Sequence, residues 1–324
     1  MPASTRPVPD LDAEVERLPY EEIGATAFGT SVGGGNPALV VLGGARISLA
    51  AMQGAAERTG LETGVVLPPE GAADLQLRFF VAGSEMSMCV HGTIGAVAVL
   101  AGRIPDLPRT LRIETRSGLV TVRWTRGKRG VERGVEVTVS QAAPEFKSPL
   151  TTSSSLNPLL AALRMTSDEL DLEVGPVQSV SVSRAKLLVP VRDHRALDSL
   201  TPDYERLWAV CDGVGVTGVY AFTRSPRSRD RDIDARQFPL RAGFVEDPAT
   251  GVAAAALAGY LCRSALTGAN DKPHVGRYRI GQGDAMGCPC KLYASAFVDG
   301  GSIIATGVRG HGEVSTGRSL PRLP

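Results

Sequence analysis

Residues 92–102 read GTIGAVAVLAG and residues 249–259 read ATGVAAAALAG, and these two stretches decide the fold. Aligned without a gap, they share Thr, Ala, Ala, Leu, Ala and Gly at the same places, 157 residues apart. Each belongs to a longer and mostly apolar segment, His91–Arg103 or Thr250–Arg263. A helix that is apolar on all sides lies inside a domain, so both segments are predicted to be central helices.

Short strand-like runs surround both predicted helices. Several alternate apolar and polar residues, and they are bounded by Gly, Pro or charged residues, as strands commonly are. The order of strands, turn, buried helix and strands is the same in both halves, which predicts a duplicated unit. The runs are Leu39–Leu42, Gly64–Leu67, Leu75–Val81, Leu111–Glu114 and Leu119–Trp124 in the first half, and Val177–Val182, Leu187–Val191, Val219–Thr223, Lys291–Val298 and Ser302–Val308 in the second.

The duplication predicts an α+β fold of two pseudo-symmetric domains, each a rolled, mostly antiparallel sheet around its own helix. We expect an N-terminal extension over residues 1–19, a first domain over 20–145 and a second over 146–324. The C-terminal tail of the second domain is free to pack on the first. The N-termini of the two helices are able to face one another across the domain boundary.

Three segments outside this pattern carry predictions of their own. The stretch Gln141–Asn157 contains two prolines and a Thr/Ser run, which is typical of a connection between domains. Leu159–Leu172 has helical spacing. Thr223–Arg236 alternates in the sign of its charges, which favours a solvated loop over a nucleic-acid patch.

The composition excludes several classes of function. Thirty-five Lys and Arg balance 34 Asp and Glu, so the formal charge of +1 offers no footprint for nucleic acid or an anionic membrane. The longest apolar runs are about half the ~20 residues that span a bilayer, and no secretory signal is visible. Five cysteines, an odd number, suit a reducing compartment. We therefore expect a cytoplasmic protein with a small-molecule partner.

Ionisable side chains stand at the start of each predicted helix. Cys89 and His91 stand at the first, and Asp247 precedes the second. Helix N-termini favour anions, so two facing ends could hold a carboxylate and flank one carbon with proton-transfer groups. An ordinary N-cap at Asp247, followed by Pro248, would also explain these residues. Cys89 is either a thiolate whose pKa the helix lowers or a small buried hydrophobe.

Motifs for cofactors are missing from the sequence. It has no dinucleotide fingerprint, P-loop, nucleophile elbow or HExxH pattern. Cys288 and Cys290 are the only closely spaced cysteines, without a second pair at zinc-finger distance. We therefore expect neither cofactor nor metal, and a reaction that moves a proton.

Four ordered motifs stand along the chain: GNPALVV at 35–41, LET at 61–63, CVHGT at 89–93 and EDPATG at 246–251. They resemble those of the PhzF-like phenazine-biosynthesis proteins. Weaker matches lie at Arg236–Phe238 and near Gln282, and together the matches run from about residue 20 to residue 318. The resemblance implies a diaminopimelate epimerase-like fold with its site in the interdomain cleft, and a homodimer.

The resemblance also implies roles for individual residues. In the family's best-understood members a glutamate moves a proton during isomerisation of a dihydro-hydroxyanthranilate, and by motif this glutamate falls on Glu62. A carboxylic acid can serve this role if burial raises its pKa toward the working pH. The implied catalytic residues are Glu62, His91, Asp247 and Cys89, and the implied substrate-binding residues are Asn36, Val90, Gly92, Thr93, Thr250, Gly251 and Val252.

Three positions depart from the family's pattern. Val90 stands where members usually have Gly, while Val252 and Leu61 stand where they usually have Ser. The hydroxyl missing at position 252 would be expected to help bind substrate or shuttle protons. We therefore expect a more apolar pocket and a substrate other than the phenazine precursor.

Three functions remain open from the sequence. The first is a cofactor-independent isomerase that moves a proton on a small carboxylated substrate, for example a cyclic specialised metabolite, through Glu62 with His91 and Asp247 assisting. The second is a Cys89-dependent epimerase or lyase. Proline racemases use one cysteine per domain, and Cys89 resembles the first of them, but Asp247 stands at the second position. The third is a non-catalytic protein that binds a small molecule in the cleft.

Overall fold

The computed structural model describes residues 11–30, 34–43, 47–127, 134–265 and 272–315. The strands of the first half are β1 Glu21–Ala27, β2 Asn36–Leu42, β3 Thr63–Leu67, β4 Leu75–Val81, β5 Ser84–Met86, β6 Thr110–Thr115, β7 Gly118–Arg126 and β8 Val135–Gln141. The last strand of the chain, β16 (Ser302–Val314), pairs antiparallel with both β8 and β1. This strand closes the sheet of the first half into a ring, while β5 pairs with β4 beside it.

The second half continues the same sheet outward from β16. In spatial order the following strands are β15 Cys290–Asp299, β14 His274–Gln282, β13 Ile233–Pro239, β12 Gly218–Thr223, β11 Lys186–Pro190, β10 Gln178–Ser181 and β9 Glu145–Phe146. Parallel pairing occurs between β2 and β3, β4 and β6, β11 and β12, and β13 and β14. The other pairings of the described strands are antiparallel, as the sequence predicts.

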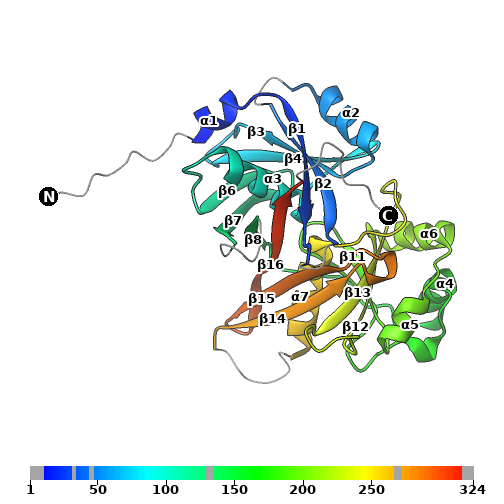
Figure 1. Cartoon of the computed structure of the whole chain (residues 1–324). Helices are drawn as coiled ribbons and strands as arrows, with labels where there is room; N and C mark the ends of the chain where they lie inside the picture. Colours follow the sequence, from blue (N-terminus) through cyan, green and yellow to red (C-terminus); the bar gives the residue numbers. More distant parts are fainter. Residues whose placement is uncertain (1–10, 31–33, 44–46, 128–133, 266–271, 316–324) are drawn as a thin grey trace.

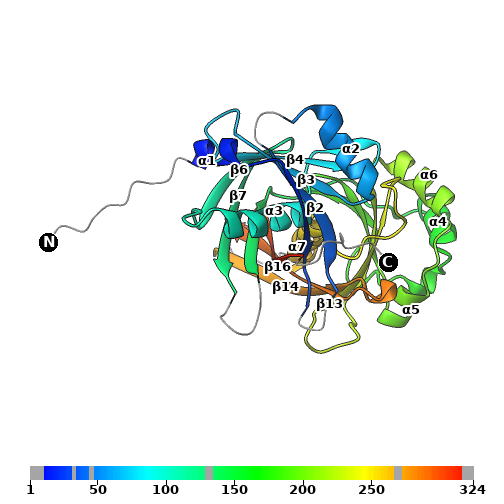
Figure 2. The same ribbon diagram turned by 45° about the horizontal axis from the view of Figure 1, so that its top comes forward.

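One apolar helix lies inside each half, as Figures 1 and 2 show. Helix α3 (Val90–Arg103) contacts β1, β2, β8 and β16, and helix α7 (Gly251–Ala265) contacts β14, β15 and β16. Small residues permit this close packing. A Cβ atom at Gly312 of β16, for example, would lie 2.6 Å from Cγ2 of Ile94 in α3. The two central helices predicted from the sequence are therefore confirmed.

Shorter helices cover the outer faces of the sheet (Figure 1). Helix α2 (Leu49–Thr59) lies over β3 and β4, and α4 (Ser153–Leu163) and α6 (Tyr204–Val214) pack together outside the second half with α5 (His194–Ser199) beside them. Short 3-10 turns occupy Ser167–Glu169 and Asp284–Met286. Within the predicted N-terminal extension, residues 11–17 form α1 (Leu11–Arg17), whose Leu11 and Val15 are buried.

Two predictions are wrong in position: the connection over Gln141–Asn157 and the helix over Leu159–Leu172. Helix α4 starts at Ser153, because the hydroxyl of Thr152 caps it by accepting from the backbone N–H of Ser155 at 3.3 Å. It ends at Arg164, which has the left-handed φ of 55°. The Thr/Ser run is therefore a helix start, and β9 occupies part of the same stretch.

The charged segment Thr223–Arg236 is a solvated loop only in part. Its last residues enter β13, where Asp234 and Arg236 are buried. Arg227 and Arg231 both form ion pairs with Asp234, which explains how this carboxylate can be buried.

The division at residue 145 stays a prediction. β16, which belongs by sequence to the second half, supplies the strand that closes the first ring. Within the described part of the chain, no helix has the length and apolar character needed to cross a membrane.

Candidate active site

Three side chains meet at the N-terminus of α3. Glu62 follows α2 and directly precedes β3, Cys89 is the N-cap of α3, and His91 lies in the first turn of α3. Nε2 of His91 lies 2.9 Å from Oε2 of Glu62, and Sγ of Cys89 lies 3.3 Å from Nδ1 of the same imidazole. The thiol also contacts Oε2 of Glu62 at 3.4 Å. The structure thus brings together three of the four predicted catalytic side chains.

The electrostatics of this cluster differ from the sequence-based expectation. Burial raises the pKa of Glu62, but the facing His91, the hydrogen bond between the two and the charge of Arg184 outweigh it and lower the pKa to about 2. Burial lowers the pKa of His91, but Cys89 and Glu62 raise it well above its ordinary value. Glu62 and His91 therefore form an ion pair at neutral pH, and the pKa of Glu62 is lowered rather than raised.

The thiol of Cys89 is not activated by its helix. Burial and the charge of Glu62 raise the pKa of Cys89, although the backbone N–H of Gly92 donates to Sγ at 3.3 Å. The sequence left open a pKa lowered by the helix N-terminus. That interpretation is wrong because the nearby carboxylate and the lack of solvent outweigh the helix end.

Asp247, the fourth predicted catalytic residue, lies just before α7. Its backbone pairs with Gln237 of β13, which fixes the chain at this point. Nδ2 of Asn36 donates to Oδ1 of Asp247 at 2.6 Å, and the hydroxyl of Thr250 donates to Oδ2. Burial and the charge of Glu62 raise the pKa of Asp247 to about 6. A carboxyl whose pKa burial raises toward the working pH is therefore found at Asp247 and not at Glu62.

Gln282 of β14 holds the start of α7. Its amide donates to the backbone carbonyl of Asp247 at 2.7 Å, and its Oε1 accepts from the backbone N–H of Thr250 at 3.2 Å and from the hydroxyl of Tyr220 at 3.0 Å. The sequence motif around Gln282 is thus a support for the Asp247 loop.

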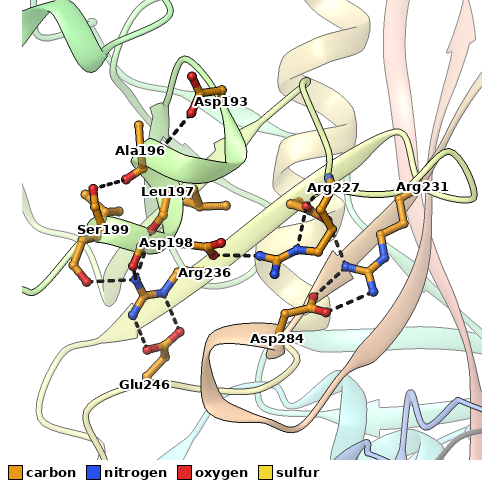
Figure 3. A network of polar contacts seen from close by, with 12 residues as sticks. Asp193, Ala196, Leu197, Asp198, Ser199, Arg227, Arg231, Arg236, Glu246 and Asp284 are labelled. Atoms are coloured by element: carbon orange, nitrogen blue, oxygen red, sulfur yellow. Dashed lines mark hydrogen bonds and ion pairs between the residues drawn. The ribbon is translucent and has the colours of Figure 1, made fainter.

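A buried ion pair fixes the same loop from the other side (Figure 3). Arg236 donates from Nε to Oε1 of Glu246 at 2.9 Å and from Nη2 to Oε2 at 2.8 Å, a bidentate geometry. Its Nη1 donates to the backbone carbonyls of Leu197 and Leu200 at the end of α5, at 3.1 and 2.9 Å. Because Glu246 directly precedes Asp247, this network limits where the carboxyl of Asp247 can lie.

The site is a pocket of about 400 Å³, open solvent at its mouth included. Of the predicted catalytic residues, Glu62, Cys89, His91 and Asp247 all line it. Of the predicted substrate-binding residues, Val90, Thr250, Gly251 and Val252 line it, whereas Asn36, Gly92 and Thr93 are not among its lining residues. Asn36 instead holds Asp247, and the hydroxyl of Thr93 donates to the carbonyl of Cys89 at 2.8 Å.

The N-termini of the two central helices meet at the floor of this site. A Cβ atom at Gly251 would lie 2.4 Å from Cβ of Val90, so the valine occupies the space directly against the glycine. The predicted facing of the helix N-termini is confirmed.

Several lining residues were not predicted. Arg184 and Lys186 come from the end of the β10–β11 connection and the start of β11, Gln237 from β13, and Phe244 from the loop before Asp247. A lysine that opens an otherwise apolar strand was a usable signal for Lys186. Arg184 and Phe244 lie in connecting segments, where no periodic pattern indicates a position.

A metal ion would also find donors here. One ligand atom each from Glu62, Cys89 and His91 lies within 4.8 Å of the others, a set that could hold a metal ion. Carboxylate, thiolate and imidazole groups are all ligands that zinc accepts.

Comparisons with known proteins agree with this geometry. A family model described as phenazine biosynthesis-like protein matches residues 25–316. The uncharacterized isomerase YfhB of Bacillus subtilis is 30% identical over 250 residues, which cover 76% of this chain and 81% of that protein. The trans-2,3-dihydro-3-hydroxyanthranilate isomerase of Pseudomonas aeruginosa is 30% identical over 290 residues, 88% of this chain and 94% of that protein.

The fold is likewise shared with solved structures. A phenazine biosynthesis protein of the PhzF family from Bacillus anthracis superposes with a TM-score of 0.77 at 24% identity, covering 91% of this chain and 96% of that one. Racemase and epimerase structures share the same architecture, so the predicted α+β, diaminopimelate epimerase-like fold is confirmed. Since the family model spans most of the sequence, the chain belongs to the phenazine biosynthesis-like protein family, whose members are isomerases.

Proposed function

We propose that this chain is a cofactor-independent isomerase that moves a proton on a small carboxylated substrate. The observation that carries the proposal is the ion pair of Glu62 and His91, 2.9 Å apart, in a pocket that Asp247 also lines. Proton transfer by a positioned side chain needs a group in the correct protonation state within reach of the carbon. Glu62 supplies an ionised carboxylate, and Asp247 supplies a carboxyl with a pKa of about 6.

Glu62 is the base of the proposed reaction. Its carboxylate takes a proton from a substrate carbon, and the electron pair of the broken C–H bond enters the conjugated system next to the substrate's acid group. The resulting carboxylic acid of Glu62 then returns the proton to another carbon of that system, which completes the isomerisation. No net proton, electron or co-reactant is consumed.

His91 and the two helix ends support the charge that forms. The imidazolium of His91 keeps Glu62 ionised before the transfer and remains beside the negative charge afterwards. Backbone N–H groups at the first turns of α3 and α7 have no partner within their helices and are suited to a carboxylate. These two helix starts meet at the contact of Val90 with Gly251, inside the pocket.

The substrate we propose differs from that of the Pseudomonas aeruginosa isomerase. Val90 and Val252 line the pocket with apolar side chains where a smaller residue and a hydroxyl are usual, and Met88 and Phe244 extend that apolar lining. A cyclic specialised metabolite with a carboxylate fits this chemistry. The homodimer implied by the resemblance is proposed as well, and light scattering after size-exclusion chromatography tests it.

Deuterium exchange tests the proposed function. Wild-type protein incubated in D2O with a panel of carboxylates is expected to put deuterium into at least one of them, as proton NMR would show. Glu62→Gln removes the base, and removal of a general base lowers rates by about 100-fold to 10,000-fold. Glu57→Gln is the matched control, because Glu57 is exposed on α2 outside the pocket. Full exchange in Glu62→Gln would show that Glu62 is not the base.

A further inference from the structure

Two cations of the pocket form no close ion pair among the described residues. Lys186, the first residue of β11, is buried, and its Nζ donates to the backbone carbonyl of Thr217 at 3.3 Å. Arg184, two residues earlier, donates from Nη1 to Sδ of Met86 at 3.0 Å. Sulfur is a weak acceptor, and among the described residues neither cation lies within ion-pair distance of a carboxylate. Both line the pocket.

A buried ammonium group with one carbonyl partner is costly for a folded protein. Burial and the charge of Arg184 lower the pKa of Lys186 to about 7, although the charges of Asp247 and Glu62 act in the opposite direction. Two cationic side chains held side by side repel each other as well. An anion between the two cations would offset both the cost of burying the ammonium group and the repulsion between the cations. This part of the pocket is therefore suited to bind an anion.

Gln237 points to a ligand independently of the two cations. Its side chain is 1% exposed and lines the pocket, yet neither Nε2 nor Oε1 has a hydrogen-bond partner among the described residues. Nearly all buried side-chain amides in folded proteins are hydrogen-bonded. The amide can donate to an oxygen of a bound acid and accept from a hydroxyl or amine next to it.

We propose that Arg184, Lys186 and Gln237 form a second anion subsite, and that the substrate of this chain is a small dicarboxylic acid. One carboxylate lies at the helix ends beside Glu62, a placement that rests on the proposed function. The other carboxylate lies against Arg184 and Lys186 and accepts from Nε2 of Gln237.

The charge and the lining of the pocket agree with such a molecule. The acid/base residues and the two cations contribute charge, and Val90, Val252 and Phe244 leave an apolar wall for the carbon skeleton. Apolar walls with a few placed polar groups are typical of small-molecule sites.

Paired ligands test the subsite. Calorimetric titration at constant ionic strength would compare malonate with acetate, succinate with propionate, glutarate with butyrate, and phthalate with benzoate. We expect at least one dicarboxylate to bind about tenfold or more tightly than its partner, since a charge-assisted contact is worth about 1.5–3 kcal/mol, and 1.4 kcal/mol is tenfold. Equal affinity within all four pairs would overturn the subsite.

The variants Lys186→Met and Arg184→Met assign that preference to residues. Each is expected to weaken dicarboxylate binding about tenfold or more and to change monocarboxylate binding less than about threefold. Lys147→Met is the matched control, because Nζ of Lys147 also donates to a single backbone carbonyl, that of Val214 at 3.4 Å, but lies outside the pocket. A preference that survives both pocket variants would equally overturn the subsite.

Misfolding of a variant and failure of the proposed function can both be distinguished from failure of the subsite. Lys186→Met removes a buried charge and is expected to fold, and Arg184→Met, in a half-buried turn, gives an independent answer. Glu62→Gln is expected to keep the dicarboxylate preference and lose deuterium exchange. Selective binding without exchange by the wild type would refute the isomerase and keep the subsite. If the wild type exchanged deuterium into monocarboxylates, and Lys186→Met left this exchange unchanged, the subsite would be refuted and the isomerase kept.

Discussion

At the scale of single residues, the environment separates two carboxyl groups by their pKa. Glu62 lies against the imidazole of His91 and has a pKa of about 2, whereas Asp247, without a facing cation in ion-pair contact among the described residues, has a pKa of about 6. Pairs of titratable groups whose environments push their pKa values apart are typical of acid/base sites. At neutral pH Glu62 is thus ionised, and Asp247 titrates close to the working range.

The raised pKa of Asp247 predicts a pH-dependent loss of stability. The folded protein holds this proton up to about pH 6, while the unfolded chain releases it near the ordinary value of 3.8. The contribution to stability is therefore complete below pH 3.8 and lost as the pH rises through 6, by as much as about 3 kcal/mol. Asp247→Asn has no proton to lose, so its free energy of unfolding relative to wild type should rise over this range.

Urea denaturation at a series of pH values measures this difference. The control is Asp212→Asn, because Asp212 is exposed and pairs with Arg241 outside the pocket. A difference between Asp247→Asn and wild type that stayed constant from about pH 4 to about pH 7 would contradict the raised pKa.

Cys89 is predicted to act through structure rather than as a base. Its thiol caps α3 and has a raised pKa, so Cys89→Ser, which can keep the cap, should retain deuterium exchange within about tenfold. Cys89→Ala should lose about 1 kcal/mol of stability because the N–H of Gly92 loses its acceptor. Exchange and thermal denaturation are the measurements. Loss of exchange in both variants, with exchange retained in Glu62→Gln, would favour the Cys89-dependent epimerase instead.

At the scale of elements, the site depends on the contact between two helix starts. Val90 opens α3 and Gly251 opens α7, and the valine fills the space that a side chain at 251 would need. Because Val90 fills this space, position 251 has no room for a larger residue than glycine.

A double-mutant cycle checks this contact. Gly251→Ala places a methyl group 2.4 Å from Cβ of Val90, and such overpacking costs about 1–3 kcal/mol. Val90→Gly removes the obstructing atoms, so the double variant should recover most of the loss, with a coupling of about 1 kcal/mol or more in urea denaturation. Gly102→Ala is the control, since a Cβ there meets nothing within 4 Å. Additive effects of Gly251→Ala and Val90→Gly would show that the helix starts adjust independently.

The sequence predicted the two central helices closely and misplaced α4. An all-apolar run of helical length leaves little choice of structure, which is why α3 and α7 begin within one residue of their predicted starts. For α4 the deciding feature is the hydroxyl cap of Thr152, and a Thr/Ser run with a following Pro158 resembles a linker as much as a helix start.

At the scale of the whole molecule, β16 joins the two halves into one structure. It pairs with β1 and β8 of the first half and with β15 of the second, and it contacts both α3 and α7. Neither half can keep its sheet complete without this strand. The pocket between the helix starts depends on the same union, because its lining comes from both halves.

This shared strand predicts that both halves unfold together. The chain has two tryptophans, Trp124 in β7 of the first half and Trp208 in α6 of the second. Single-tryptophan variants, Trp124→Phe and Trp208→Phe, report each half by fluorescence during urea unfolding. After correction for the effect of each substitution measured by circular dichroism, we expect coincident midpoints. Two separate transitions in one variant would show that the halves are independent.

The sequence by itself determined the fold class and the four acid/base candidates, because both depend on local patterns and motifs. Apolar runs, strand alternation and the repeat 157 residues apart specify the duplicated α+β unit, and the motifs place Glu62, His91, Cys89 and Asp247 in one pocket. Only the tertiary structure decided their protonation. Distances and burial between residues far apart in the chain lower the pKa of Glu62 and raise that of Asp247. Electrostatic energy depends on separation in space and on the exclusion of water, neither of which is local in sequence. For the same reason Arg184 and Gln237 became visible as pocket residues only in the folded chain.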